Sequence, residues 1–155
     1  MAHEMSVPGS INLDLIGDQS QDPMALYGQS KFANILFAKA LARRLQHEQV
    51  YVNAIHPGVV NTNMGLHAMD NSGALAQKTW SVVSGTIGLT PERGALTQLF
   101  AATSPQIENN DWRGQFFVPI GHKVEPNKLT EDEDLQERLW TYSEALVRKH
   151  IYNAK

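Results

Sequence analysis

The chain has 155 residues, of which 42% are hydrophobic, a size and composition typical of one soluble globular domain. Thirteen basic against sixteen acidic residues give a net charge of -3, which offers no basic excess for binding nucleic acid. No cysteine is present and the six histidines do not cluster, so we expect neither disulfides nor a metal site. We expect a cytoplasmic, intracellular protein without a transmembrane segment, because no apolar run approaches the roughly 20 residues of a membrane span.

The first helix is predicted from Met24 to about Gln46. Residues 1–22 before it are rich in turn formers, and Asp22 and Pro23 supply an N-cap followed by proline at the first helical position. Apolar residues cover more than one stripe of this helix. This pattern predicts burial on more than one side, against a sheet and, in a homo-oligomer, against another subunit.

The remaining elements alternate between strand and helix. In chain order they are a buried strand at Val50–His56, a helix from Thr90 to about Thr103, a strand at Gly114–Ile120 and a helix from Glu131 to about His150. Residues 61–88 show no clean period. Alternating strands and helices predict the α/β class with a parallel sheet, but only two strands and three main helices are visible. Sheets usually have about 4–6 strands, so we expect residues 1–155 to be the second half of a larger α/β domain.

Two motifs on these elements suggest chemistry. Tyr27 and Lys31 are four residues apart on the first predicted helix and therefore share one face. Pro57 and Gly58 follow the first predicted strand, at the carboxyl end where ligands bind in open α/β sheets, and their backbone can lie close to a flat ring. A solvated helix face also carries Tyr–Lys pairs, and Pro-Gly also forms plain turns, so the patterns alone leave both interpretations open.

The order and spacing of Tyr27-X-X-X-Lys31 and Pro57-Gly58-X-Val60-X-Thr62 resemble the short-chain dehydrogenase/reductase family. The amino-acid sequences of both segments are similar to those of the retinol-dehydrogenase-like branch of this family, which includes WW-domain oxidoreductases. Residues 89–95 and 114–118 match that branch as well. The resemblance implies that residues 1–155 are the C-terminal half of a doubly wound, Rossmann-type NAD(P)-binding domain. It also implies that the Gly-rich phosphate turn of the N-terminal half is absent from this sequence.

The resemblance implies a hydride transfer between NAD or NADP, with NADP favoured, and an apolar carbonyl or alcohol substrate. Tyr27 would exchange the proton with the substrate oxygen, while Lys31 would hold the nicotinamide ribose and favour the ionised form of Tyr27. The nicotinamide end of the cofactor would be held by the turn after the strand, namely by Pro57, Gly58, Val59, Val60 and Thr62.

Only Tyr27 and Lys31 of the family's four catalytic residues occur in the sequence, so we expect the isolated chain to be inactive. The alternative is a non-catalytic fragment or isoform that acts through protein association, using the exposed strand edge and the Tyr27 helix. If the protein is an enzyme, we expect the segment from Asn63 to Gly88 to govern its choice of substrate.

Overall fold

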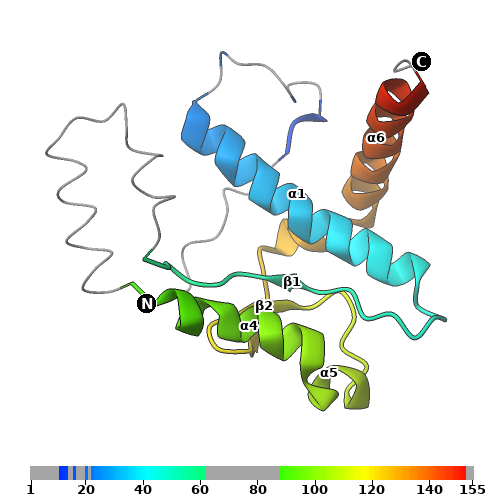
Figure 1. The fold of residues 1–155 in the computed structure, drawn as a ribbon. Coiled ribbons are helices and arrows are strands. Elements are labelled where there is room, and N and C mark those ends of the chain that lie inside the picture. The colour runs from blue at the N-terminus through cyan, green and yellow to red at the C-terminus, as the bar shows by residue number, and fades with distance from the viewer. Residues whose placement is uncertain (1–10, 14–15, 17–19, 21, 62–87, 153–155) are drawn as a thin grey trace, which may run out of the picture. The chain divides into compact units, whose positions relative to one another are not determined.

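The computed structural model of the chain describes residues 11–13, 16, 20, 22–61 and 88–152 (Figure 1). Thr62 and nearly all of the segment expected to govern substrate choice lie outside these residues, as does most of the predicted N-terminal loop. The elements in chain order are α1 (Pro23–Arg44), β1 (Ala54–Ile55), α4 (Pro91–Thr103), α5 (Pro105–Asn109), β2 (Phe116–Val118), β3 (His122–Val124), the 3-10 helix η2 (Lys128–Glu131) and α6 (Glu133–Tyr152).

Helix α1 begins and ends almost where the sequence predicts. The Asp22 carboxylate accepts a hydrogen bond from the Ala25 amide at 2.9 Å, and proline follows it in the first turn. Arg43 and Arg44 lie in the last turn, where cationic side chains are favourable near the carbonyl end of the helix. Capping at both ends therefore fixes the length of the helix that carries Tyr27.

The three strands form one sheet in the order β1-β2-β3, which confirms the α/β class. Strands β1 and β2 run parallel: the Ala54 amide donates to the Gln115 carbonyl at 2.9 Å and the His56 amide donates to the Phe117 carbonyl at 2.8 Å. The short connection from β2 to β3 makes a hairpin, with Gly121 in the left-handed region at φ 68°.

The structure corrects the predicted strands. A third strand, β3, joins the two that the sequence shows. The strand predicted as buried over Val50–His56 is reduced to Ala54–Ile55 and is only partly buried, with Val50 47% exposed. The physical reason is that β1 is an edge strand among the described residues, where only β2 pairs with it.

The acidic run at the start of the last predicted helix is also divided. Glu131 ends the 3-10 helix η2, and α6 begins two residues later at Glu133. The Asp132 carboxylate between them accepts the Leu135 amide at 2.9 Å and so caps α6. Sequence periodicity does not separate a capping residue from the first helical turn, which explains the shifted boundary.

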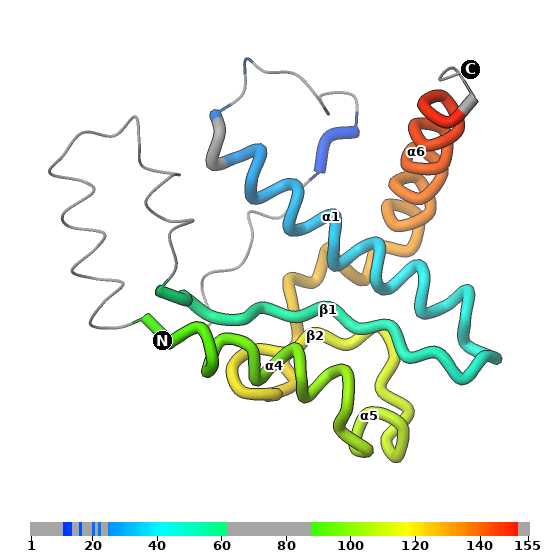
Figure 2. Tube along the Cα trace, in the orientation of Figure 1, coloured from blue at the N-terminus to red at the C-terminus, as the bar shows by residue number. Residues whose placement is uncertain are grey.

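The chain divides into two compact units. The first comprises Met1–Ala54, Ile107–Phe116 and Glu125–Lys155. Within it α1 packs against α6, as the traces in Figure 2 show. Its core is a cluster of buried apolar side chains from these two helices and the segment before them: Ile11, Phe32, Leu36 and Leu139. Burial of this stripe fixes which face of α1 remains exposed.

The second unit comprises Ile55–Gln106 and Phe117–Val124. Helix α4 approaches the segment after β1 so closely that a Cβ on Gly94 would lie 2.6 Å from a Val60 methyl group. The Phe100 ring packs edge-on against Phe117, with 5.7 Å between ring centroids. These contacts join α4 to the turn that follows β1 and to the hairpin. None of the described helices is long and apolar enough to cross a membrane.

Candidate active site

Tyr27 and Lys31 lie one turn apart on α1, in the first unit. The Lys31 ammonium is 5.3 Å from the centroid of the Tyr27 ring, within the range of a cation–π contact. Gly28 and Phe32 lie on a buried face of α1, whereas Tyr27, on the neighbouring face, is 52% exposed. The predicted pair therefore shares one accessible helix face.

The polar atoms of this pair remain available for a ligand. Within the part of the chain that the structure describes, no carboxylate pairs with the Lys31 ammonium and no hydrogen bond engages the Tyr27 hydroxyl. The Ser30 hydroxyl donates instead to the Tyr27 backbone carbonyl at 2.7 Å. A phenol and an ammonium with three donors thus stand side by side, and none of the described residues competes for them.

The segment Pro57–Val60 lies in the second unit, and Leu89 holds its C-terminal end. The Leu89 amide donates to the Val59 carbonyl at 2.8 Å, and the Asn61 amide donates to the Leu89 carbonyl at 2.9 Å. These two bonds form a parallel bridge between Val60 and Leu89. All four residues of the turn are partly buried, so part of each is exposed to solvent.

Gly58 is the one position of the turn where glycine is required. Its φ is 85°, in the left-handed region, and an added Cβ would lie 2.9 Å from Pro119 Cγ and 3.0 Å from Leu89 Cδ1. The amide of Gly58 donates to His56 Nδ1 at 2.8 Å. The family resemblance does not place His56 among the site residues. The only signal in the sequence is a ring acceptor two residues before a turn amide.

The structure therefore places the predicted site residues on two elements. Tyr27 and Lys31 share a face of α1, while Pro57, Gly58, Val59 and Val60 form the turn after β1. Among the described residues, no group of three or more histidine, aspartate and glutamate side chains could hold a metal ion.

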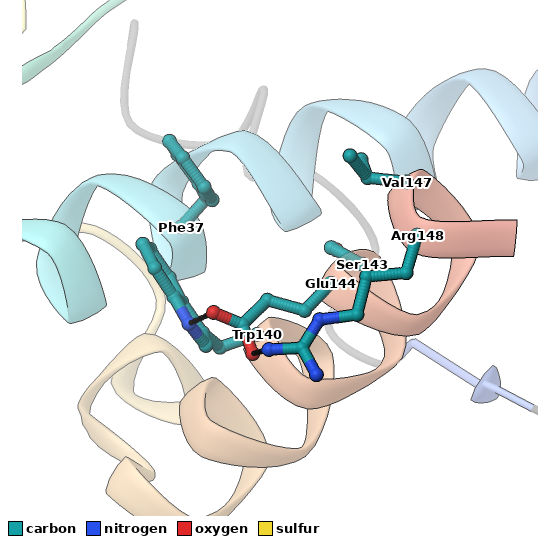
Figure 3. A pocket seen from close by; sticks show the side chains of 6 residues that line it. All are labelled: Phe37, Trp140, Ser143, Glu144, Val147 and Arg148. Carbon is teal, nitrogen blue, oxygen red and sulfur yellow. Dashed lines mark hydrogen bonds and ion pairs between the residues drawn. The ribbon is translucent and has the colours of Figure 1, made fainter. Parts of the chain in front are cut away.

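A separate hollow on the first unit contains none of the predicted residues. Figure 3 shows the stacked rings of Phe37 and Trp140, whose centroids are 5.2 Å apart, beside the side chains of the C-terminal half of α6. Glu144 accepts the Trp140 indole N–H at 3.0 Å and faces Arg148 at 3.7 Å. Its charged groups are already paired, so this hollow is a packing feature rather than a second candidate site.

The chain is similar to proteins of one known family. Residues 15–72 match the family model described as short chain dehydrogenase. Retinol dehydrogenase 14 of Homo sapiens is 39% identical over 142 residues, covering 90% of this chain and 40% of the relative. Retinol dehydrogenase 13 of Homo sapiens is 34% identical over 143 residues, covering 91% and 42%. An uncharacterized oxidoreductase of Schizosaccharomyces pombe is 35% identical over 130 residues, covering 84% and 37%.

The chain thus spans about two fifths of the length of these relatives. The residues matched by the family model include α1 with Tyr27 and Lys31 and continue through the Pro57–Val60 turn. No solved structure matched the chain significantly.

Proposed function

This chain belongs to the short-chain dehydrogenase/reductase family, and we propose that it acts in an oxidoreductase. In that enzyme it exchanges a proton with the substrate oxygen and binds the nicotinamide end of NAD or NADP. The reaction interconverts a carbonyl and an alcohol. The observation that carries this proposal is the exposed pair on α1, with the Lys31 ammonium 5.3 Å from the Tyr27 ring and no competing described carboxylate.

The donor set on α1 fits the ribose of such a cofactor. The Lys31 ammonium has three hydrogen-bond donors and can bind two neighbouring hydroxyl groups at once. The bound nicotinamide supplies or accepts the hydride. The Tyr27 hydroxyl gives its proton to the substrate oxygen during reduction and takes the proton back during oxidation. Pro57, Gly58, Val59, Val60 and Thr62 then contact the nicotinamide end.

The charge of Lys31 can assist Tyr27 strongly only where water is excluded from the two side chains. A positive charge about 4 Å from an ionised phenol stabilises it by about 1 kcal/mol in bulk water and by about 4 kcal/mol at an effective dielectric constant near 20. Tyr27 is 52% exposed in the structure. Lys31 therefore favours proton transfer by Tyr27 effectively only after bound cofactor and substrate have excluded water from the pair.

The substrate class is a further part of the proposal. Two of the relatives are named as retinol dehydrogenases, which supports an apolar alcohol or aldehyde as the small-molecule substrate. The phosphate-binding Gly-rich turn has no counterpart in the sequence. We accordingly place residues 1–155 in the C-terminal half of a Rossmann-type domain. As a separate part of the proposal, the cofactor is NAD or NADP, with NADP favoured.

The experiment is a turnover assay of the protein expressed from its complete native gene, with retinal as the probe aldehyde and NADPH or NADH as the reductant. We expect Tyr27→Phe to remove nearly all turnover while cofactor affinity changes little, because the lost hydroxyl moves the proton. Tyr142→Phe on α6 is the matched control and should retain wild-type turnover.

Two outcomes would contradict the proposal. A Tyr27→Phe protein that keeps more than about a tenth of wild-type turnover would remove Tyr27 from the chemistry. A wild-type protein without NAD(P)-dependent turnover of any carbonyl probe would favour the alternative, a non-catalytic protein that acts through association.

A further inference from the structure

We propose that His56 is a positioning residue, whose imidazole Nδ1 fixes the conformation of the Pro57–Val60 turn. The Gly58 amide donates to His56 Nδ1 at 2.8 Å across two residues of sequence. Both residues are partly buried and lie in the second unit. The inference rests on the proposed function only where it takes the nicotinamide end of the cofactor as the ligand of the turn. The hydrogen bond itself involves no cofactor.

The bond closes a small ring like that of an Asx turn, in which the side chain of one residue accepts the amide hydrogen two residues later. Nδ1 of histidine and Oδ1 of asparagine are both bonded to Cγ, so both reach the same amide. A backbone amide needs an acceptor where water is scarce, and the ring nitrogen supplies one to a residue that the sheet does not pair. His56 therefore supplies the acceptor for the Gly58 amide.

The imidazole is itself tied to the sheet. The His56 amide donates to the Phe117 carbonyl at 2.8 Å, which holds the backbone of His56 at the end of β1. The side chain then reaches forward to Gly58, whose left-handed backbone brings it against Pro119 and Leu89. Val59 and Asn61 are bonded to Leu89 on the other side. The turn is thus fixed at its start by His56 and at its end by Leu89, before any ligand arrives.

The hydrogen bond also fixes the protonation pattern of the ring. Because the Gly58 amide is the donor, Nδ1 must present its lone pair, and a neutral imidazole then carries its hydrogen on Nε2. The other neutral tautomer would place two hydrogens against each other. His56 is accordingly expected as the Nε2–H tautomer in the folded protein.

The test is amide hydrogen exchange of Gly58 in the protein expressed from its complete native gene, measured by NMR without cofactor. We expect His56→Gln to raise the Gly58 exchange rate about tenfold, because the glutamine acceptor lies one atom too far along its side chain. His56→Asn should restore protection to within about twofold of wild type, since its Oδ1 replaces Nδ1. His122→Gln on β3 of the same unit is the matched control and should leave Gly58 unchanged.

The Gly94 amide, bonded to the Thr90 carbonyl at 2.8 Å within α4, reports general loosening of the same unit. Faster exchange at Gly58 with unchanged exchange at Gly94 supports the proposal. An equal rise at both amides, no rise at Gly58, or no rescue by His56→Asn would overturn it.

Nitrogen-15 spectra of the ring provide a second readout, in which a protonated Nδ1 in the neutral ring would also overturn the proposal. Neither measurement uses a cofactor. The proposed oxidoreductase activity can therefore fail while this role of His56 stands, and the role can fail while the activity stands.

Discussion

Lys31 has two tasks in the proposed site, whereas Tyr27 has one. In the proposed mechanism the Lys31 ammonium both binds the ribose and assists proton transfer by the Tyr27 hydroxyl, and it stands 5.3 Å from the Tyr27 ring. We therefore predict that Lys31→Ala lowers turnover and cofactor affinity, each by about tenfold or more.

Tyr27→Phe should lower turnover but leave cofactor affinity unchanged. Both variants are compared by their kcat and their cofactor Kd in the protein expressed from its complete native gene. Lys39→Ala is the control on the same helix, because its ammonium pairs with Glu131 at 2.9 Å. If cofactor affinity is unchanged in Lys31→Ala, Lys31 does not bind the ribose.

Gly58 supports a prediction about stability. An alanine there must adopt a φ of 85° and would place Cβ 2.9 Å from Pro119 Cγ. We expect Gly58→Ala to lower the free energy of unfolding by about 1–3 kcal/mol, measured by urea denaturation. Gly114→Ala is the matched control, since its φ is 65° but its Cβ would meet Ala42 at an ordinary 3.5 Å. Equal losses for the two variants would show that the close approach at Gly58 is unimportant.

The sequence predicts some contacts of single residues but not others. The four-residue spacing of Tyr27 and Lys31 predicts a shared helix face because helical geometry is regular, and the structure has that arrangement. The bond from Gly58 to His56 depends on one side-chain rotamer and one left-handed residue. No periodicity encodes these torsion angles, so the sequence leaves His56 as an ordinary residue at the end of a strand.

At the scale of elements, Glu137 joins the two helices of the first unit. Its carboxylate on α6 lies 2.9 Å from Arg43 Nη2 and 3.0 Å from Arg44 Nη1 on α1. Hydrogen bonds from Arg44 and then from Arg43 hold the pKa of Glu137 below its usual range. A lowered folded-state pKa means that this contribution to stability is complete above the ordinary glutamate pKa. It is lost as the pH falls through the lowered value.

We therefore predict that Glu137→Gln unfolds at a lower urea concentration than wild type at pH 7, and that the difference disappears in strong acid. The effect is small because the pair is exposed. Glu144→Gln is the control, since Glu144 and Arg148 are 3.7 Å apart on a single helix, α6. A difference between Glu137→Gln and wild type that persists unchanged below pH 2 would contradict the assignment to this charge.

The helices were predictable where caps and periodicity coincide, as at Asp22-Pro23 for α1 and Thr90-Pro91 for α4. The short elements were not. Helix α5 has five residues, too few to show a period, and β3 exposes two of its three residues. Neither element is long enough for a periodic pattern of its own to predict it.

At the scale of the whole molecule, the sequence predicted the α/β class because helices and strands alternate along the chain. The apolar composition of Val50–His56 by itself does not predict the partial exposure of β1, because that exposure depends on whether another strand lies on its far side. Among the described residues only β2 pairs with β1. Burial of a strand is a property of the assembled sheet, so apolar composition alone overestimates it.

The edge position of β1 and the exposed apolar side chains of the helices lead to the last prediction. Phe37 on α1 is 43% exposed, and Val147 and Ile151 on α6 are 56% and 62% exposed. An unpaired strand edge and exposed apolar side chains both favour association between copies. We therefore expect the 155-residue chain alone to form homo-oligomers, with the Tyr27 helix α1 in the contact. Light scattering measures the mass of the purified chain.

The same chain should bind a nicotinamide dinucleotide only weakly. Its proposed contacts reach the ribose and nicotinamide through Lys31 and the Pro57–Val60 turn, and no Gly-rich turn is present to hold the pyrophosphate. A titration with NADPH, followed by nicotinamide fluorescence, should show no saturation at micromolar concentrations. Phe37→Glu tests the association, because a charge on the exposed face of α1 should shift the oligomer toward monomer. Saturable micromolar binding by a monodisperse wild-type monomer would contradict both parts, since these residues alone would then suffice for the cofactor.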